Sequence, residues 1–173
     1  NLTPNLGKIE STNPCGEQPL LPWEACNLGS INLAKYVTEK GELELEKIKQ
    51  DIKLYVRAMD NVVSRSDFFI PEITEAVNKT RKLGLGYMGL ADMFILMGIE
   101  YGSEESLNLA DKLAKMLSDE ARAASFELGK EKGIFPAFKG SVYDKESEAH
   151  KKFFKKERAM NYDGAPRNVT LTT

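Results

Sequence analysis

The chain has 173 residues, a formal net charge of −2 and 42% hydrophobic residues. This composition predicts a domain with a hydrophobic core, and the near-neutral charge excludes the basic surface typical of a nucleic-acid-binding protein. No apolar run is long enough to span a membrane, and the first residues lack the basic and apolar regions of a secretory signal. Two cysteines are too few for a disulfide scaffold, so we expect a cytoplasmic protein. The single histidine, His150, with no Cys/His cluster, argues against a protein-built metal site such as zinc.

The first half of the chain contains a loop, a strand and two helices in that order. Residues 1–25 are rich in proline and glycine and are expected to be extended or looped. Residues 26–37 predict a strand with a bend at Gly29. Apolar residues at helical spacing predict a helix from Leu43 to about Ser66, and Pro71 suits the first turn of a second, shorter helix.

The second half begins with "KLGLGYMG", which predicts a strand that runs into a turn. The apolar stretch that follows predicts a buried helix ending near Gly98. Ser103 is the expected N-cap of a long helix, with Leu107 the first residue of its apolar face and an end near Gly133.

The chain is expected to end irregularly. Residues 134–167 show no clear periodicity. In "NVTLTT", Val169 and Leu171 alternate with threonines, which predicts the first residues of a strand. Because the chain starts without Met and stops inside this pattern, we interpret residues 1–173 as a single partial domain of a longer protein. Strands that alternate with helices predict an α/β architecture, either barrel-like or layered.

Three glycines, Gly84, Gly86 and Gly89, form the G-x-G-x-x-G pattern of nicotinamide-dinucleotide-binding domains. Such a site also needs a second parallel strand after the helix, ending in an acid that binds the ribose. Here another helix follows instead. The pattern therefore favours close strand-to-helix packing, with dinucleotide binding as the alternative.

The stretch "NPCGE" places Asn13, Cys15 and Glu17 at every second position. In an extended segment such residues share one face, and Pro14 favours an extended backbone at the residue before it. An amide, a thiol and a carboxylate are therefore expected to converge on one small ligand. The alternative is a polar loop with an incidental cysteine.

The chemistry of this trio is unusual for a cysteine enzyme. The amide can hydrogen-bond a hydroxyl, and the carboxylate can accept a proton from one. A carboxylate beside Cys15 would raise the pKa of the thiol, which argues against a thiolate nucleophile and is compatible with a neutral thiol or a sulfur radical. Cys26 lies too far along the chain for the C-x-x-C redox spacing. It is either a small core residue or a second redox thiol at the same site.

Longer motifs resemble one family. "STNPCGEQPLLPWEACNLGSINL" resembles the active-site region of the ribonucleotide reductase catalytic chain, and this sequence is most like that of the adenosylcobalamin-dependent (class II) branch. "RKLGLGYMGLADMFILMGIEYGSEE" and the terminal "RNVTLTT" also resemble this family. A chain served by a separate metal-radical subunit (class I) is the alternative branch.

The resemblance implies a role for each site residue. Cys15 corresponds to the thiyl-radical cysteine that abstracts the ribose 3′ hydrogen, and Glu17 to the base that takes the 3′-hydroxyl proton as water leaves C2′. Asn13 corresponds to the amide that hydrogen-bonds the sugar. Cys26 corresponds to one of two cysteines that supply reducing equivalents and end as a disulfide. The implied fold is a ten-stranded α/β barrel with a central finger loop that carries Cys15.

The resemblance also implies a cofactor and partners. Adenosylcobalamin would supply the radical. The expected partners are a ribonucleotide substrate, a thioredoxin-like reductant and, in the full-length protein, a dNTP effector; a homodimer is an open alternative, and neither nucleic acid nor membrane is expected. A second cysteine for Cys26 and the family's phosphate loop are not in this sequence. We therefore expect a fragment that does not turn over alone.

Overall fold

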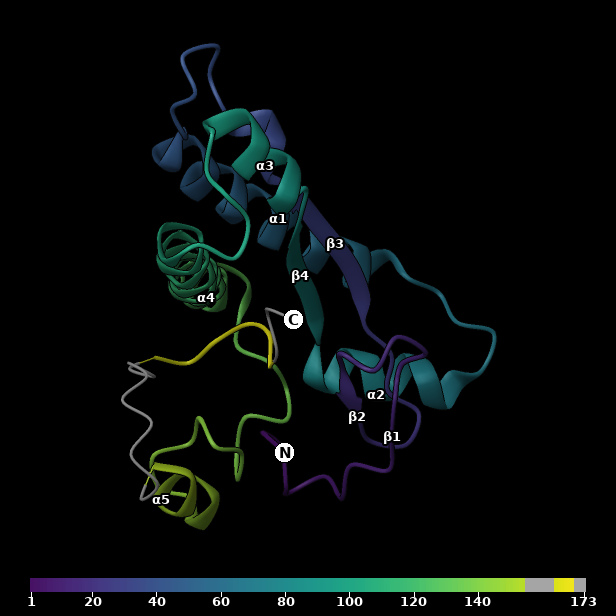
Figure 1. The fold of residues 1–173 in the computed structure, drawn as a ribbon. Coiled ribbons are helices and arrows are strands. Elements are labelled where there is room, and N and C mark those ends of the chain that lie inside the picture. The colour runs from purple at the N-terminus through teal and green to yellow at the C-terminus, as the bar shows by residue number, and fades with distance from the viewer. Residues whose placement is uncertain (155–163, 170–173) are drawn as a thin grey trace.

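The computed structural model describes residues 1–154 and 164–169 (Figure 1). Its core is a pair of parallel strands covered by helices. The elements in chain order are β1 (Ser11–Thr12), β2 (Pro19–Leu20), β3 (Asn27–Asn32), η1 (Leu33–Tyr36), α1 (Leu45–Arg65), α2 (Pro71–Thr80), β4 (Leu83–Met88), α3 (Leu90–Met97), α4 (Glu104–Lys132) and α5 (Glu148–Phe154).

Strands β3 and β4 pair in parallel, with Asn27 opposite Leu83 and Asn32 opposite Met88. Parallel neighbours need a long crossover, and here α1 and α2 lie between the two strands in sequence. Ile31 and the β4 residues Leu83 and Leu85 are fully buried. The predicted α/β character is therefore confirmed, although the described residues do not close a barrel.

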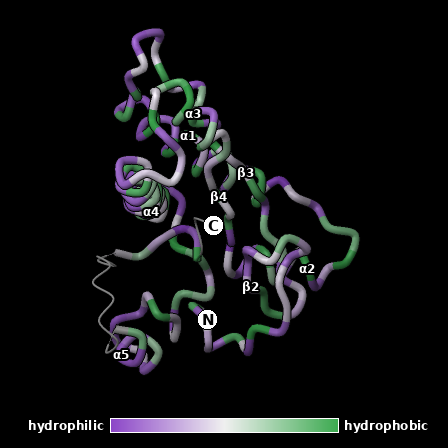
Figure 2. The backbone as a smooth tube through the Cα atoms, viewed as in Figure 1, coloured by the Kyte–Doolittle hydropathy of each residue, from purple (hydrophilic) through white to green (hydrophobic). Residues whose placement is uncertain are grey.

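Helix α1 covers the strand pair with an apolar face, and Ile48, Ile52 and Val56 on that face are fully buried. Helix α4 packs against α1. In Figure 2, α4 seen end-on carries both hydrophilic and hydrophobic segments, as a helix with one buried face does. The buried face of α4 includes Leu113 but excludes Leu107, which is 63% exposed. The prediction that Leu107 belongs to this face was wrong, because in the first turn of α4 it is Ser106 that is buried.

Most predicted helix ends are confirmed. Pro71 occupies the first turn of α2, and Gly98 follows α3 as its C-cap. The hydroxyl of Ser103 accepts a hydrogen bond from the Ser106 amide at 3.2 Å and so caps α4, which ends before Gly133.

Three other predictions need correction. Helix α5 lies inside residues predicted to be irregular, and Ser147 accepts a hydrogen bond from the His150 amide at 2.9 Å, as an N-cap residue does. Val169 does not lie in a strand, and residues 170–173, where the strand was expected to continue, are outside the described part of the chain. Ile95 and Leu96 of α3 are exposed, whereas Met93 and Phe94 are buried in the core, so only one face of the helix predicted to be buried is covered.

A buried polar cluster ties α1 to the end of the described chain. Asp60 of α1 is fully buried, and its Oδ1 accepts hydrogen bonds from Arg81 Nη2 at 2.8 Å and Asn168 Nδ2 at 3.1 Å. Ser125 of α4 donates to the side-chain oxygen of Asn168 at 3.0 Å. One carboxylate therefore holds together α1, the α2–β4 junction, α4 and residues 167–169.

The G-x-G-x-x-G glycines support close packing. Gly84 and Gly86 are buried in β4, and Gly89 has φ +68° at the start of α3. A Cβ at Gly89 would clash with the side-chain oxygen of Asn32, which accepts a hydrogen bond from Ala34 at the start of η1. The glycine therefore satisfies both a left-handed backbone and a close approach.

We expect Gly89→Ala to cost more stability than Gly98→Ala, about 2–3 kcal/mol against about 1 kcal/mol. Gly98 has φ +73° but nothing within 4 Å of an added Cβ, so its substitution strains only the backbone. Gly89→Ala also displaces Asn32. Urea unfolding of the two variants measures the difference, and equal losses would show that the Asn32 contact is unimportant.

Candidate active site

Asn13, Cys15 and Glu17 lie in the turn of a short hairpin. Strands β1 and β2 pair antiparallel, and the Gly16 amide donates to the Asn13 carbonyl at 3.0 Å across a tight turn. The predicted extended segment was therefore wrong. Pro14 at the second position of a turn and Gly16 with φ +87° favour the reversal, so alternation does not decide which side chains share a face.

The hairpin gives its three candidate residues different surroundings. Cys15 is exposed at the turn. The side-chain oxygen of Asn13 accepts a hydrogen bond from the Gln18 amide at 2.9 Å, so this oxygen stabilises the hairpin itself. Glu17 is half-buried, and its Oε2 is buried without a hydrogen-bond partner among the described residues. That oxygen is available to accept a hydrogen bond from a hydroxyl group.

Cys26 lies half-buried immediately before β3. Burial raises the pKa of the Cys26 thiol, and the charge of Glu17 raises it further. Glu24 adds to this effect, whereas Lys82 opposes it. The negative charge of Glu17 therefore acts on the Cys26 thiol, and the environment of Cys26 favours the neutral thiol.

Replacing Glu17 with glutamine is expected to lower the pKa of Cys26, because one of the negative charges that disfavour the thiolate is removed. The rate of Cys26 alkylation by iodoacetamide should then rise at a lower pH than in the unchanged chain. Mass spectrometry of the Cys26 peptide across pH 7–10 measures this shift. The exposed Glu10, on the same hairpin, provides the control Glu10→Gln, and an equal shift in both variants would contradict the assigned contact.

Three residues that sequence reasoning missed connect this hairpin to β4. Lys82 Nζ donates to Glu24 Oε2 at 2.6 Å and to the Pro19 carbonyl at 2.9 Å. Gln18 Nε2 donates to the Leu83 carbonyl at 3.3 Å. No local spacing could have revealed these contacts, because more than 50 residues separate Lys82 from Glu24 in the sequence.

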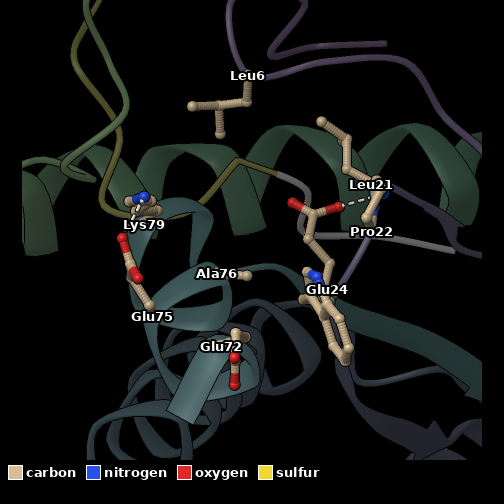
Figure 3. Close-up of a pocket in the computed structure, with 9 residues that line it drawn as sticks. Leu6, Leu21, Pro22, Glu24, Glu72, Glu75, Ala76 and Lys79 are labelled. Atoms are coloured by element: carbon tan, nitrogen blue, oxygen red, sulfur yellow. Dashed lines mark hydrogen bonds and ion pairs between the residues drawn. The ribbon is translucent and has the colours of Figure 1, made fainter.

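Glu24 also borders a surface pocket of about 300 Å³. Figure 3 shows the Glu24 carboxylate turned toward the backbone of Leu21, whose amide donates to Glu24 Oε2 at 2.7 Å. The other wall of this pocket is formed by α2, from which Glu72, Glu75 and Lys79 project. Glu75 and Lys79 pair with each other across one turn of α2.

Within residues 1–154 and 164–169, no three His, Cys, Asp or Glu side chains are grouped so that they could hold a metal ion. No helix in that part of the chain has the length and apolar character needed to cross a membrane.

Comparison with known proteins identifies the family. Residues 1–170 match the family model described as the ribonucleotide reductase barrel domain. The chain belongs to the ribonucleotide reductase family. This membership agrees with the parallel β3–β4 pair and supports an α/β barrel-type fold. It does not favour the dinucleotide-binding alternative, and among the described residues no strand follows α3.

Relatives within the ribonucleotide reductase family carry two kinds of name. The chain is 45% identical over 146 residues to a vitamin B12-dependent ribonucleoside-diphosphate reductase of Thermoplasma acidophilum, and 46% identical over 143 residues to a protein of the same name from Mycobacterium tuberculosis. These matches cover 84% and 83% of the chain but only 19% and 20% of the relatives. A ribonucleoside-diphosphate reductase subunit alpha of Chlamydia pneumoniae is 33% identical over 145 residues, which is 82% of the chain and 14% of that protein. The chain thus spans about a fifth of the length of the vitamin B12-dependent relatives.

Proposed function

We propose that this chain is part of the catalytic barrel of an adenosylcobalamin-dependent ribonucleotide reductase, which converts ribonucleotides to 2′-deoxyribonucleotides through a thiyl radical. The observation that carries the proposal is the arrangement of three groups. One hairpin bears an exposed thiol, Cys15, and a carboxylate, Glu17, with a buried unpartnered oxygen. The charge of that carboxylate raises the pKa of the second thiol, Cys26.

Each side chain has a defined task in this reaction. A sulfur radical at Cys15 takes the 3′ hydrogen of the ribose and returns a hydrogen atom at the end. Glu17 accepts the 3′-hydroxyl proton while water leaves C2′. Cys26 and a second cysteine outside this chain give up two electrons and two protons and form a disulfide. Asn13 hydrogen-bonds the sugar through its amide.

The exposed position of Cys15 fits a radical generator bound by other parts of the protein, because the thiol is accessible from outside the chain. When bound, adenosylcobalamin supplies the radical by homolysis of its cobalt–carbon bond. We assign no residue of this chain to holding the cofactor. The relatives from Thermoplasma acidophilum and Mycobacterium tuberculosis, both named vitamin B12-dependent, are 45% and 46% identical to the chain, whereas the Chlamydia subunit alpha relatives are 33% to 36% identical, which favours this branch over the class I alternative.

In the same proposal, residues 1–173 form one partial domain of a ten-stranded barrel. Strands β3 and β4 are two of its parallel strands, and the β1–β2 hairpin belongs to the finger loop. The substrate is a ribonucleoside diphosphate, as in the names of the relatives from Thermoplasma acidophilum and Mycobacterium tuberculosis. The reductant is a thioredoxin-like protein, a dNTP acts as effector, and the full-length protein works in the cytoplasm, in keeping with two free cysteines.

The test is deoxynucleotide formation by the full-length protein, with a dithiol reductant, in the presence and absence of adenosylcobalamin. We expect product only when the cofactor is added, and none from the 173-residue chain alone. Equal product formation without the cofactor would contradict the assigned branch. Turnover by the chain alone would contradict its assignment as a partial domain.

A further inference from the structure

The buried Lys82–Glu24 pair lies at the base of the Cys15 hairpin. The Lys82 side chain is 5% exposed and the Glu24 side chain 2% exposed. Charged residues are rarely buried this deeply unless they are paired, and here the two charged atoms lie 2.6 Å apart. The two side chains therefore form a buried ion pair, not a chance contact between surface charges.

This pair joins three segments. Pro19, whose carbonyl accepts from Lys82 Nζ, belongs to β2 of the Cys15 hairpin. Glu24 lies two residues before Cys26. Lys82 directly precedes β4, whose first residue pairs with Asn27, the residue after Cys26. One ammonium group thus binds the hairpin, the segment leading to Cys26 and the strand beside Cys26.

The adjacent Arg81 makes a different set of contacts. It is also buried and ion-paired, but its partner is Asp60 in α1, and its bonds hold the helices together. Buried ion pairs add little net stability compared with apolar replacements, whereas they can specify one geometry. The two neighbouring cations therefore have different structural roles. Arg81 connects the helices, whereas Lys82 connects the Cys15 hairpin to the segment that leads to Cys26.

We propose that Lys82, through Glu24 and the Pro19 carbonyl, is a positioning residue that fixes the Cys15 hairpin relative to Cys26. This inference rests on the proposed function of Cys15 and Cys26. Radical transfer needs reacting atoms about 3–3.5 Å apart, and a displacement of about 1 Å can lower the rate about 100-fold. A hairpin attached to β4 only by Gln18 would sample such displacements.

The test uses the double variant Glu24→Gln/Lys82→Met in the full-length reductase. It removes both charges together, so no buried charge is left unpaired, and glutamine still accepts the Leu21 amide. We expect kcat to fall about 10- to 100-fold while KM for the nucleotide stays within about twofold. Hydrogen exchange of the Gln18 and Leu21 amides should become at least about tenfold faster.

The matched control is Asp60→Asn/Arg81→Met, which removes the neighbouring buried pair, with Lys132→Met as a milder substitute if that variant does not fold. In the folded control protein, kcat and the hydrogen-exchange rates of the Gln18 and Leu21 amides should be unchanged. Equal kcat losses in both double variants, or wild-type kcat and exchange in Glu24→Gln/Lys82→Met, would overturn the proposal. Cys15→Ala is measured in parallel: if it remains active, the proposed function fails, and hydrogen exchange still decides whether Lys82 holds the hairpin.

Discussion

Replacing Cys15 with alanine is expected to abolish deoxynucleotide formation by the full-length protein, a loss of more than about 10⁴-fold. The reason is chemical: alanine has no sulfur on which a radical can form, and no other cysteine lies on the hairpin. Because Cys15 is exposed at the turn, its loss should leave the fold intact. Product assays together with urea unfolding measure both effects.

Thr12→Ala is the control for this prediction, since Thr12 is exposed on β1 of the same hairpin. It should retain activity within about threefold, because it removes no group from the proposed chemistry. Wild-type turnover by Cys15→Ala would rule out Cys15 as the radical site. An inactive Thr12→Ala that is fully folded would indicate that the hairpin tolerates no change at all.

Asp60→Asn is expected to destabilise the folded chain by about 3 kcal/mol, because it leaves the buried guanidinium of Arg81 without its counter-charge. Arg81, Asn168 and Arg167 all depend on this carboxylate. Urea unfolding at pH 7 measures the loss. The exposed pair Lys115–Asp119 provides the control: Asp119→Asn should change stability by less than about 0.5 kcal/mol.

The pH dependence of this effect follows from the pKa of Asp60. Burial raises this pKa, but the hydrogen bonds and charge of Arg81, with help from Asn168 and Arg167, outweigh burial and lower it below its ordinary value. The stabilisation is therefore complete above the unfolded pKa of about 3.9 and is lost as the pH falls through the folded pKa. The stability gap between the wild type and Asp60→Asn should stay constant from pH 7 to pH 5 and narrow below about pH 4. A gap that widens in acid would contradict this account.

The helices could be predicted because their signals are local. The apolar spacing from Ile48 to Val63 gave α1, and Ser103 and Gly133 marked the ends of α4. The same local logic misplaced Leu107, because burial depends on which parts of the folded chain a side chain meets. It did not predict α5, because the Ser147 cap stands in a charged segment without a clear apolar period.

The geometry of the candidate site could not be predicted from residue spacing. Spacing singled out Asn13, Cys15 and Glu17, yet Pro14 and Gly16 formed a turn instead of an extended segment. The effect of Glu17 on the pKa of Cys26 and the Lys82–Glu24 ion pair arise from tertiary folding. Such pairings join distant segments, and no periodicity of one segment encodes them.

The most direct test of the central claim, that a sulfur radical at Cys15 removes the 3′ hydrogen, is single-turnover reduction of a ribonucleotide deuterated at C3′. The full-length protein with adenosylcobalamin should reduce the deuterated substrate measurably more slowly than the unlabelled one, because the Cys15 radical must break the C3′–D bond, which has a lower zero-point energy than the C3′–H bond, as the S–D bond forms. Identical rates under conditions in which chemistry limits turnover would contradict the proposed role of Cys15.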